Sequence, residues 1–349
     1  MKPTQSGRRP ATILVWLGGA LGDTLLGYPA LAALRMWAPW ARVTLVGRPS
    51  YAGFALSSGL VDQVVDSGGP WAANLFGRAA PALNPPELAV IWSAAYADMA
   101  QRLEHLGTRA IIAAAPRPAE VRHQARYLLD CLHPLGIPRV LLPAPPPALE
   151  ALPAVLRSLI SESPTRTVLL HPGSGSAWKL WPLISWLRLA ESLADRGYAV
   201  RWSFGPDDER LRAAFLEAGP AWRSVILPLV PLTQFASLVA RCALFVSPDT
   251  GVAHLAALVR APQITLFGPT DPRRWRPLSR DAVLARAPNR HGCGWENAPE
   301  GGELPAPLRR CAEGSGEHCW CLAELSPETV LSLCLDVLEA PNPKVSTPQ

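Results

Sequence analysis

Short apolar runs alternate with longer amphipathic stretches along this 349-residue chain, and this alternation restricts the fold more than any other feature. Apolar runs of this length are typical of strands buried on both faces, and helical stretches between them favour parallel sheets covered on both sides. Strands are expected at 12–17, 43–46, 61–65, 88–92, 110–114, 167–170, 199–204, 225–227, 243–246 and 263–267, with helices between them such as 183–196 and 232–241. The sequence therefore predicts an α/β fold with doubly wound sheets.

A proline-rich stretch separates the two series of predicted strands. Its four prolines, at 143–147, lack the backbone N–H that a helix interior or a central strand needs, so a linker is expected there. We expect a first doubly wound domain at 1–146 and a second at 147–325. The last segment, 326–349, is expected to hold one helix capped by Ser326, followed by a tail.

The charge balance excludes one class of partner. The chain has 33 basic and 28 acidic residues, a net charge of +5. This small, dispersed excess suits anionic substrates or an anionic membrane surface and is too weak to indicate nucleic-acid binding. No apolar run reaches the roughly 18–20 residues that span a bilayer. The basic N-terminus resembles a secretory signal, but glycines and Asp23 interrupt the apolar run that follows, so a cytoplasmic protein is expected.

The first loop that can carry chemistry is GGALGDT at 18–24, directly after the first predicted strand. Its glycines permit a sharp turn and the close approach of a ligand, and the following helix N-terminus favours negative charge. The spacing differs from the G-x-G-x-x-G dinucleotide fingerprint. Asp23 is expected at the carboxyl edge of the sheet, where it can act as a general base; a helix cap is the alternative.

The second loop is HPGSGSAWKLWP at 171–182, after the first strand of the second predicted domain. Ser174, Ser176 and the glycines offer N–H and O–H donors, and Lys179 offers a cation. Together these groups can hold a phosphate. The alternative is a flexible loop with a solvated lysine.

The third loop is SPDTGVAHLAA at 247–257, and it opens a helix with Asp249 or Thr250 at the cap. The free N–H groups near Gly251 and the positive helix end are then expected to face the ligand crevice. His254 lies about one turn inside this helix, either as a packed core residue or as a ligand contact.

A fourth loop, GPDDE at 205–209, follows the second strand of the same domain. One of its acids, Asp208 or Glu209, can accept hydrogen bonds from ribose hydroxyls. Helix capping is the alternative role for either residue.

Taken in chain order, these loops resemble glycosyltransferase family 9, the bacterial heptosyltransferases of lipopolysaccharide core assembly. The resemblance runs from about residue 13 to 337 and is densest in ILVWLGGALGDTLLGYPALAALR, LLHPGSGSAWKLWP, FGPDDE and SPDTGVAHLAALVRAPQITLFGPTDPRRW. It implies a GT-B architecture, in which two Rossmann-like domains face each other across a cleft. It also implies inverting transfer of a sugar, expected to be heptose from an ADP-heptose-type donor, to a lipopolysaccharide-core or related glycan acceptor, with no cofactor and no metal required.

The resemblance further implies a role for individual residues. Asp23 matches the family's general base, and Lys179 matches the lysine at the donor diphosphate. The other implied donor-binding residues are Ser174, Ser176, Asp208, Glu209, Asp249, Thr250, Gly251 and His254. Closure of the two domains would bring the base and the lysine across the sugar and exclude water.

The acceptor side departs from the family pattern. The stretch VIWSAAYAD at 90–98 differs from the acidic, Gly- and Arg-containing segment usual in the family, which leaves the acceptor open. Arg122, His123 and Arg126 form a basic cluster that can meet an anionic, lipid-linked acceptor; a solvated helix face is the alternative.

A lipid-linked acceptor would place the protein at the cytoplasmic face of the inner membrane. Tryptophans with arginines nearby can rest on such a surface, although core or rim packing is their ordinary role. The tryptophans concerned are Trp37, Trp40, Trp71 and Trp92.

The cysteines do not suggest a disulfide framework, because their number, seven, is odd. Those near the C-terminus lack the paired C-x-x-C arms of a zinc site, so reduced thiols are expected rather than a metal site. The residues concerned are Cys293, Cys311, His318, Cys319 and Cys321.

Two other functions remain open on the sequence alone. One is an NAD(P)-dependent oxidoreductase with Rossmann domains, against which the glycine spacing argues. The other is a non-catalytic nucleotide-binding protein of GT-B architecture. Binding of NAD(P), or nucleotide binding without transfer, would separate these from a glycosyltransferase.

Overall fold

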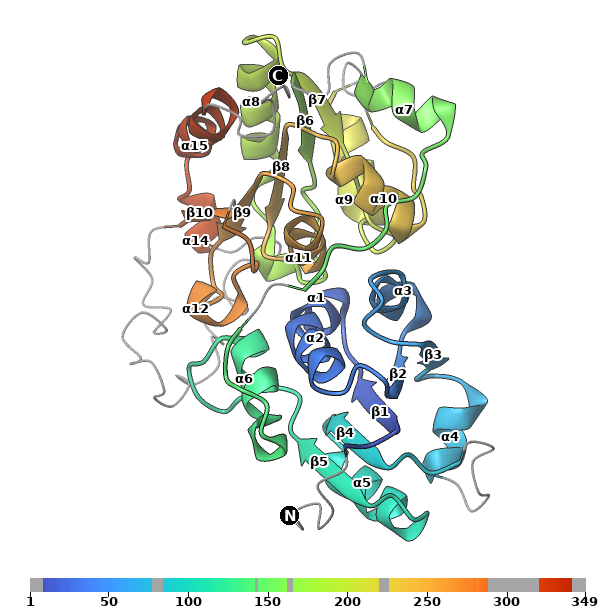
Figure 1. Cartoon of the computed structure of the whole chain (residues 1–349). Helices are drawn as coiled ribbons and strands as arrows, with labels where there is room; N and C mark the ends of the chain where they lie inside the picture. Colours follow the sequence, from blue (N-terminus) through green and yellow to red (C-terminus); the bar gives the residue numbers. More distant parts are fainter. Residues whose placement is uncertain are drawn as a thin grey trace. The chain divides into compact units, whose positions relative to one another are not determined.

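The computed structural model describes residues 9–76, 84–141, 144–161, 166–219, 226–280, 282–287 and 320–340. The chain forms two compact units. The first holds the chain up to Leu149 together with Arg273–Leu278, and the second holds the other described residues. Each unit contains one five-stranded sheet in which all the paired strands are parallel (Figure 1).

The sheet of the first unit has the strand order β3-β2-β1-β4-β5. Its strands are β1 (Thr12–Leu17), β2 (Arg42–Gly47), β3 (Gln63–Asp66), β4 (Leu88–Trp92) and β5 (Ala110–Ala114). The central strand, β1, pairs with β2 on one side and β4 on the other, with Val15 opposite both Leu45 and Val90. The order of strand addition therefore reverses between β1 and β4.

Helices cover both faces of this sheet (Figure 1). They are α1 (Leu21–Leu26), α2 (Tyr28–Trp37), α3 (Pro49–Ser57), α4 (Pro70–Phe76), α5 (Tyr96–His105) and α6 (Gln124–Asp130), followed by the short 3-10 helix η1 (His133–Leu135). On one face, Leu14, Ala89 and Ile91 of the strands form a core cluster with Met99 and Leu103 of α5.

The second unit repeats this plan with the strand order β10-β9-β8-β6-β7. Its strands are β6 (Thr167–Leu170), β7 (Ala199–Trp202), β8 (Leu244–Pro248), β9 (Gln263–Phe267) and β10 (Ala282–Arg286). The other elements in this part of the chain are α7 (Ala154–Ser161), η3 (Ala177–Lys179), α8 (Leu183–Ala194), α9 (Glu209–Ala218), α10 (Leu232–Val239), α11 (Gly251–Leu258), α12 (Pro272–Trp275), α14 (Trp320–Ala323) and α15 (Pro327–Glu339). Here the strand order reverses between β6 and β8.

The last helix completes the core of the second unit. Val330 of α15 lies in one buried cluster with Trp181 and with Trp186 of α8, and the Trp181 indole N–H donates to the Leu325 carbonyl over 2.9 Å. Ser326 caps α15 by accepting a hydrogen bond from the Thr329 N–H.

The predicted fold class is confirmed, because both sheets are parallel and doubly wound. The strand predicted at 225–227 is wrong: residue 225 lies outside the described residues, and Ile226 forms only an isolated bridge to Trp202. The sequence analysis also missed β10, a five-residue edge strand that is mostly only half-buried. Within the described ranges, no helix is both long and apolar enough to cross a bilayer.

Candidate functional site

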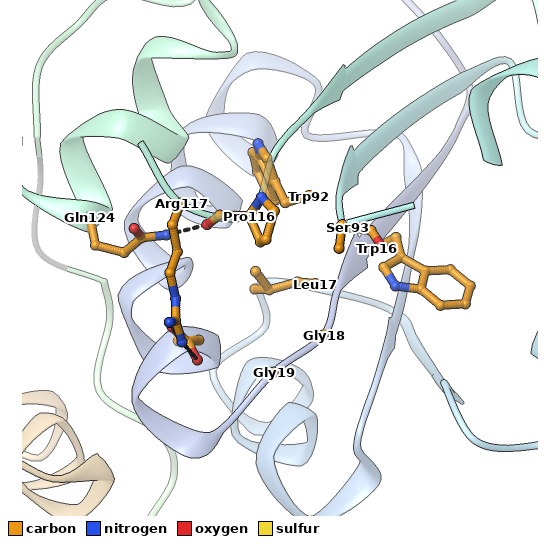
Figure 2. A pocket seen from close by; sticks show the side chains of 11 residues that line it. Trp16, Leu17, Gly18, Gly19, Trp92, Ser93, Pro116, Arg117 and Gln124 are labelled. Atoms are coloured by element: carbon orange, nitrogen blue, oxygen red, sulfur yellow. Dashed lines mark hydrogen bonds and ion pairs between the residues drawn. The ribbon is translucent and has the colours of Figure 1, made fainter. Parts of the chain in front are cut away.

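A cavity of about 300 Å³ lies at the carboxyl ends of β1 and β4 (Figure 2). Its walls come from the loop after β1, the end of β4 and residues of the 116–124 segment. These two strands mark the point at which the sheet order reverses, and ligands of doubly wound sheets bind in the crevice outside such a point. The cavity is therefore the first candidate for the reacting centre.

Asp23 places its carboxylate in this cavity from the third position of α1. The Ala20 N–H donates to Asp23 Oδ2 over 3.3 Å, so the carboxylate also caps the helix. Gly19, with a φ of +117°, turns the chain immediately before the helix, and a Cβ there would lie 3.0 Å from the Cβ of Asp23. The glycine thus permits both the turn and the close packing of Asp23, and the two roles expected of Asp23 are compatible.

Arg117 is a functional candidate that the sequence analysis missed. Its Nη2 atom donates to both carboxylate oxygens of Asp23, at 3.2 and 3.0 Å. Its guanidinium also lies 5.4 Å from the centre of the Trp275 ring, within the range of a cation–π contact. The Arg117 side chain is nevertheless 57% exposed, whereas that of Asp23 is 16% exposed. No local motif could identify Arg117, because 94 residues separate it from Asp23.

In the second unit, Lys179 and Asp249 lie together at the carboxyl ends of β6 and β8. The Lys179 Nζ atom donates to Asp249 Oδ2 over 2.8 Å and to the Asp249 carbonyl over 3.3 Å. Thr270 donates its hydroxyl hydrogen to the same Oδ2 over 2.7 Å. This arrangement holds a lysine ammonium at the strand-order reversal of the second sheet, the position at which an anionic ligand is expected.

Asp208 turns away from solvent and joins two loops. The Gly205 N–H donates to Asp208 Oδ2 over 2.6 Å, and the Ser174 N–H also bonds to the carboxylate. Gly173 is packed so closely against this carboxylate that a Cβ there would overlap it. Burial raises the pKa of Asp208. The carboxylate therefore ties the loops after β6 and β7, and the ribose contact expected of Asp208 stays a prediction.

The other predicted donor-side residues lie on the same loops. Gly251 begins α11, and Thr250 precedes it with an extended backbone and no side-chain cap bond, while His254 is buried one turn further on. The remaining positions are Ser174 and Ser176, both half-buried in the loop before η3, and Glu209, which is exposed in the first turn of α9.

The predicted basic cluster is not an open cationic patch. Arg122 pairs with Glu120 at 2.8 Å and with Asp130 at 3.0 Å. The His123 Nδ1 atom accepts a hydrogen bond from the Ala125 N–H and caps α6, and its Nε2 atom bonds to the Arg276 carbonyl. Burial lowers the pKa of His123. Of the three, Arg126 is exposed, whereas Arg122 and His123 are half-buried.

The four tryptophans of the membrane hypothesis differ in exposure. Trp92 is buried and Trp37 and Trp71 are half-buried, whereas Trp40 is 60% exposed. The Arg9 guanidinium lies 5.6 and 5.9 Å from the centres of the Trp37 and Trp40 rings. Contact with a membrane stays a prediction.

The C-terminal Cys/His group lies almost wholly outside the described residues, and only Cys321, buried in α14, falls within them. Among the residues that the structure describes, no three His, Cys, Asp or Glu side chains come together in a way that could hold a metal ion.

Acidification is expected to destabilise the protein through His171, which directly follows β6 and hydrogen-bonds to Ser203 at 3.1 Å. Burial lowers the pKa of His171 to about 4, against about 6.5 in an unfolded chain. The unfolded state therefore binds more protons, and the free energy of unfolding falls as the pH drops from about 6.5 towards 4, by about 2 kcal/mol between pH 7 and pH 5. The raised pKa of Asp208 has the opposite effect, because it increases the free energy of unfolding as the pH falls. The contribution of His171 is therefore measured with a variant in which His171 alone is replaced. Urea unfolding at both pH values should show a smaller loss for His171→Asn than for the wild type; equal losses would contradict the assignment.

One stretch of the chain matches a known protein family. Residues 148–297 match the family model of glycosyltransferase family 9 (heptosyltransferase). This part of the chain is similar to glycosyltransferase family 9. Over 107 residues the chain is 41% identical to lipopolysaccharide heptosyltransferase 1 of Pseudomonas aeruginosa, a match that covers 30% of this chain and 29% of that relative. The sequence match thus spans about a third of each protein.

The similarity in fold to solved structures extends over nearly the whole chain. A solved glycosyl transferase of family 9 from Veillonella parvula has a TM-score of 0.71 and 17% identity, and the match covers 95% of this chain and 98% of that one. A heptosyltransferase of Escherichia coli, solved with ADP-2-deoxy-2-fluoro heptose, has a TM-score of 0.61 and 19% identity over 93% and 99% of the two chains. These similarities confirm the predicted GT-B fold class.

Proposed function

We propose that this chain is an inverting glycosyltransferase that moves heptose from an ADP-heptose-type donor to a lipopolysaccharide-core or related glycan. The observation that carries the proposal is the placement of Asp23 and Lys179, each at the strand-order reversal of its own sheet. A carboxylate and a cation at two such points suit a reaction that needs a base for the acceptor and a positive charge for the leaving diphosphate. The relatives named above support the choice of a heptosyl donor.

The proposed reaction is a single displacement at the anomeric carbon. The acceptor hydroxyl oxygen forms the new bond to this carbon as the bond to the diphosphate oxygen breaks, and Asp23 takes the hydroxyl proton. Lys179 then faces a leaving group that gains negative charge. Its ammonium has three N–H groups and Asp249 accepts two of them, so one remains for the diphosphate. The N–H groups at the start of α11 add a second source of positive potential.

The donor-side residues divide into two groups in this proposal. Lys179, Thr250 and Gly251 would face the diphosphate, while Glu209 is the exposed acid that remains available to a ribose hydroxyl. Asp208 and Asp249 would act indirectly, since the first ties two loops and the second orients the lysine. The comparisons lend no support to the oxidoreductase alternative.

Melting temperatures measured with ADP, UDP, GDP and NAD⁺ test the proposal first, because a ligand that binds the folded state raises apparent stability. ADP is expected to raise the melting temperature by several degrees and the other three to have much smaller effects. Release of ADP from ADP-heptose in the presence of heptose-free lipopolysaccharide then tests transfer. Binding of ADP without any transfer would favour the non-catalytic alternative, and preference for NAD⁺ would overturn the proposal.

A further inference from the structure

A second cavity, about 670 Å³ in volume, lies at the carboxyl end of β5, the edge strand of the first sheet. Tyr96 at the start of α5 and Tyr127 of α6 contribute to its walls, together with small side chains between 113 and 119. Arg117 lines this cavity and also the cavity that holds Asp23. The two spaces therefore adjoin at one guanidinium.

The walls of this second cavity, the β5 groove, suit a sugar ring. The Tyr127 hydroxyl donates to the Ala115 carbonyl over 2.9 Å, which fixes the ring of Tyr127. Burial raises the pKa of Tyr127 to about 12, so its phenol stays neutral. Tyr96 is 38% exposed, and Ala114, Ala115 and Ala119 leave room beside the two rings. Aromatic rings beside small side chains offer flat apolar surfaces on which the C–H face of a saccharide can pack.

Arg117 is the basic residue among those that line the β5 groove. Arg117 reaches both spaces and is the more exposed partner in its pair with Asp23. The acidic residue on the groove wall, Glu120, is paired with Arg122 at 2.8 Å, and Arg122 also pairs with Asp130 at 3.0 Å. A guanidinium has five N–H donors, and the contacts of Arg117 with Asp23 use one nitrogen, Nη2. Donors therefore remain for a carboxylate or a phosphate.

We propose that the β5 groove binds the sugar adjacent to the accepting sugar, an anionic saccharide that packs on Tyr96 and pairs with Arg117. The inference rests on the proposed function, which puts the accepting hydroxyl at Asp23 and so requires a place for the next sugar of the glycan. The groove supplies this place on the far side of Arg117. Tyr96 also falls in the 90–98 stretch that departs from the family pattern, so the groove is suited to a specificity particular to this chain.

The inference is tested with oligosaccharide released from heptose-free lipopolysaccharide, used intact, dephosphorylated or carboxyl-reduced. Tyr96→Ala is expected to raise the KM for the intact oligosaccharide about tenfold with little change in the KM for ADP-heptose. Tyr96→Phe, which keeps the ring, should remain near wild type. Arg117→Met should raise the KM for the intact oligosaccharide by tenfold or more. The wild type should bind either the dephosphorylated or the carboxyl-reduced oligosaccharide more weakly than the intact one, and this difference should disappear in Arg117→Met.

Arg109→Met is the matched control for Arg117, because Arg109 is exposed at the amino end of β5, away from both cavities. Saturation-transfer NMR of the oligosaccharide, without donor, reports binding independently of transfer. If transfer occurs but Tyr96→Ala changes neither KM nor the NMR signal, the groove assignment is wrong and the proposed function stands. If the oligosaccharide binds in a Tyr96-dependent way but no ADP-heptose is consumed, the groove is supported and the proposed function fails.

Discussion

Replacement of Asp23 by asparagine is expected to slow glycosyl transfer by a factor of about 10²–10⁴ while ADP affinity stays within about twofold of wild type. Asparagine has nearly the same shape and can still accept the Ala20 N–H hydrogen bond, so the start of α1 should be preserved. It cannot take a proton from the acceptor hydroxyl. ADP binding should survive because the proposed diphosphate contacts lie in the second unit.

Transfer rates at saturating donor and acceptor, together with ADP calorimetry, check this expectation. Asp98→Asn is the control, since Asp98 lies in the first turn of α5, is exposed and is absent from the cavity walls. A rate for Asp23→Asn within threefold of wild type would remove Asp23 from the role of base. An equal loss in both variants would point to a general effect of lost negative charge.

Replacement of Gly173 by alanine is expected to lower the free energy of unfolding by about 1–3 kcal/mol and to weaken ADP binding strongly. The new methyl group would overlap the Asp208 carboxylate, which is held by the N–H groups of Gly205 and Ser174. One of the two loops must then move. Since the loop after β6 also leads into η3 and Lys179, the displacement should reach the proposed diphosphate contacts.

Gly175→Ala is the matched control two residues away, because a Cβ at Gly175 would meet no atom within 4 Å. Urea unfolding and ADP calorimetry of both variants measure the contrast. In the double variant Gly173→Ala/Asp208→Ser, the shorter side chain should relieve part of the overlap, so the two substitutions should be less than additive. Equal effects of the two glycine variants would show that Asp208 does not tie these loops.

Much of the fold could be predicted because the strands are short apolar runs that end at turn residues. β1 and β4 have the expected bounds, since they are buried in the middle of the sheet and their apolar character stops where burial stops. β10 was not predicted because it is an edge strand that is mostly half-buried, and such a strand does not need the continuous apolar run of a central strand. The strand predicted at 225–227 is wrong because three apolar residues are too few to specify a strand, and Ile226 forms only a single bridge to Trp202.

The candidate site was predictable loop by loop, but not in its pairings. Lys179 and Asp249 were each singled out from local sequence, yet their ion pair joins positions 70 residues apart. The pair of Arg117 and Asp23 likewise depends on tertiary folding. The burial of Asp208 could not be inferred either, because it follows from the absence of a side chain at Gly173, which only the packing of two loops reveals.

The return of Arg273–Leu278 to the first unit has a consequence for dissecting the protein. A fragment that stops at Leu149 would lack Trp275 beside Arg117 and the hydrogen bond from Arg274 to the Pro118 carbonyl. Expression of residues 1–149 alone would therefore give a first unit in which the surface normally covered by Arg273–Leu278 is exposed to solvent. An isolated first unit would need this six-residue segment to be added, either as a fusion or by circular permutation.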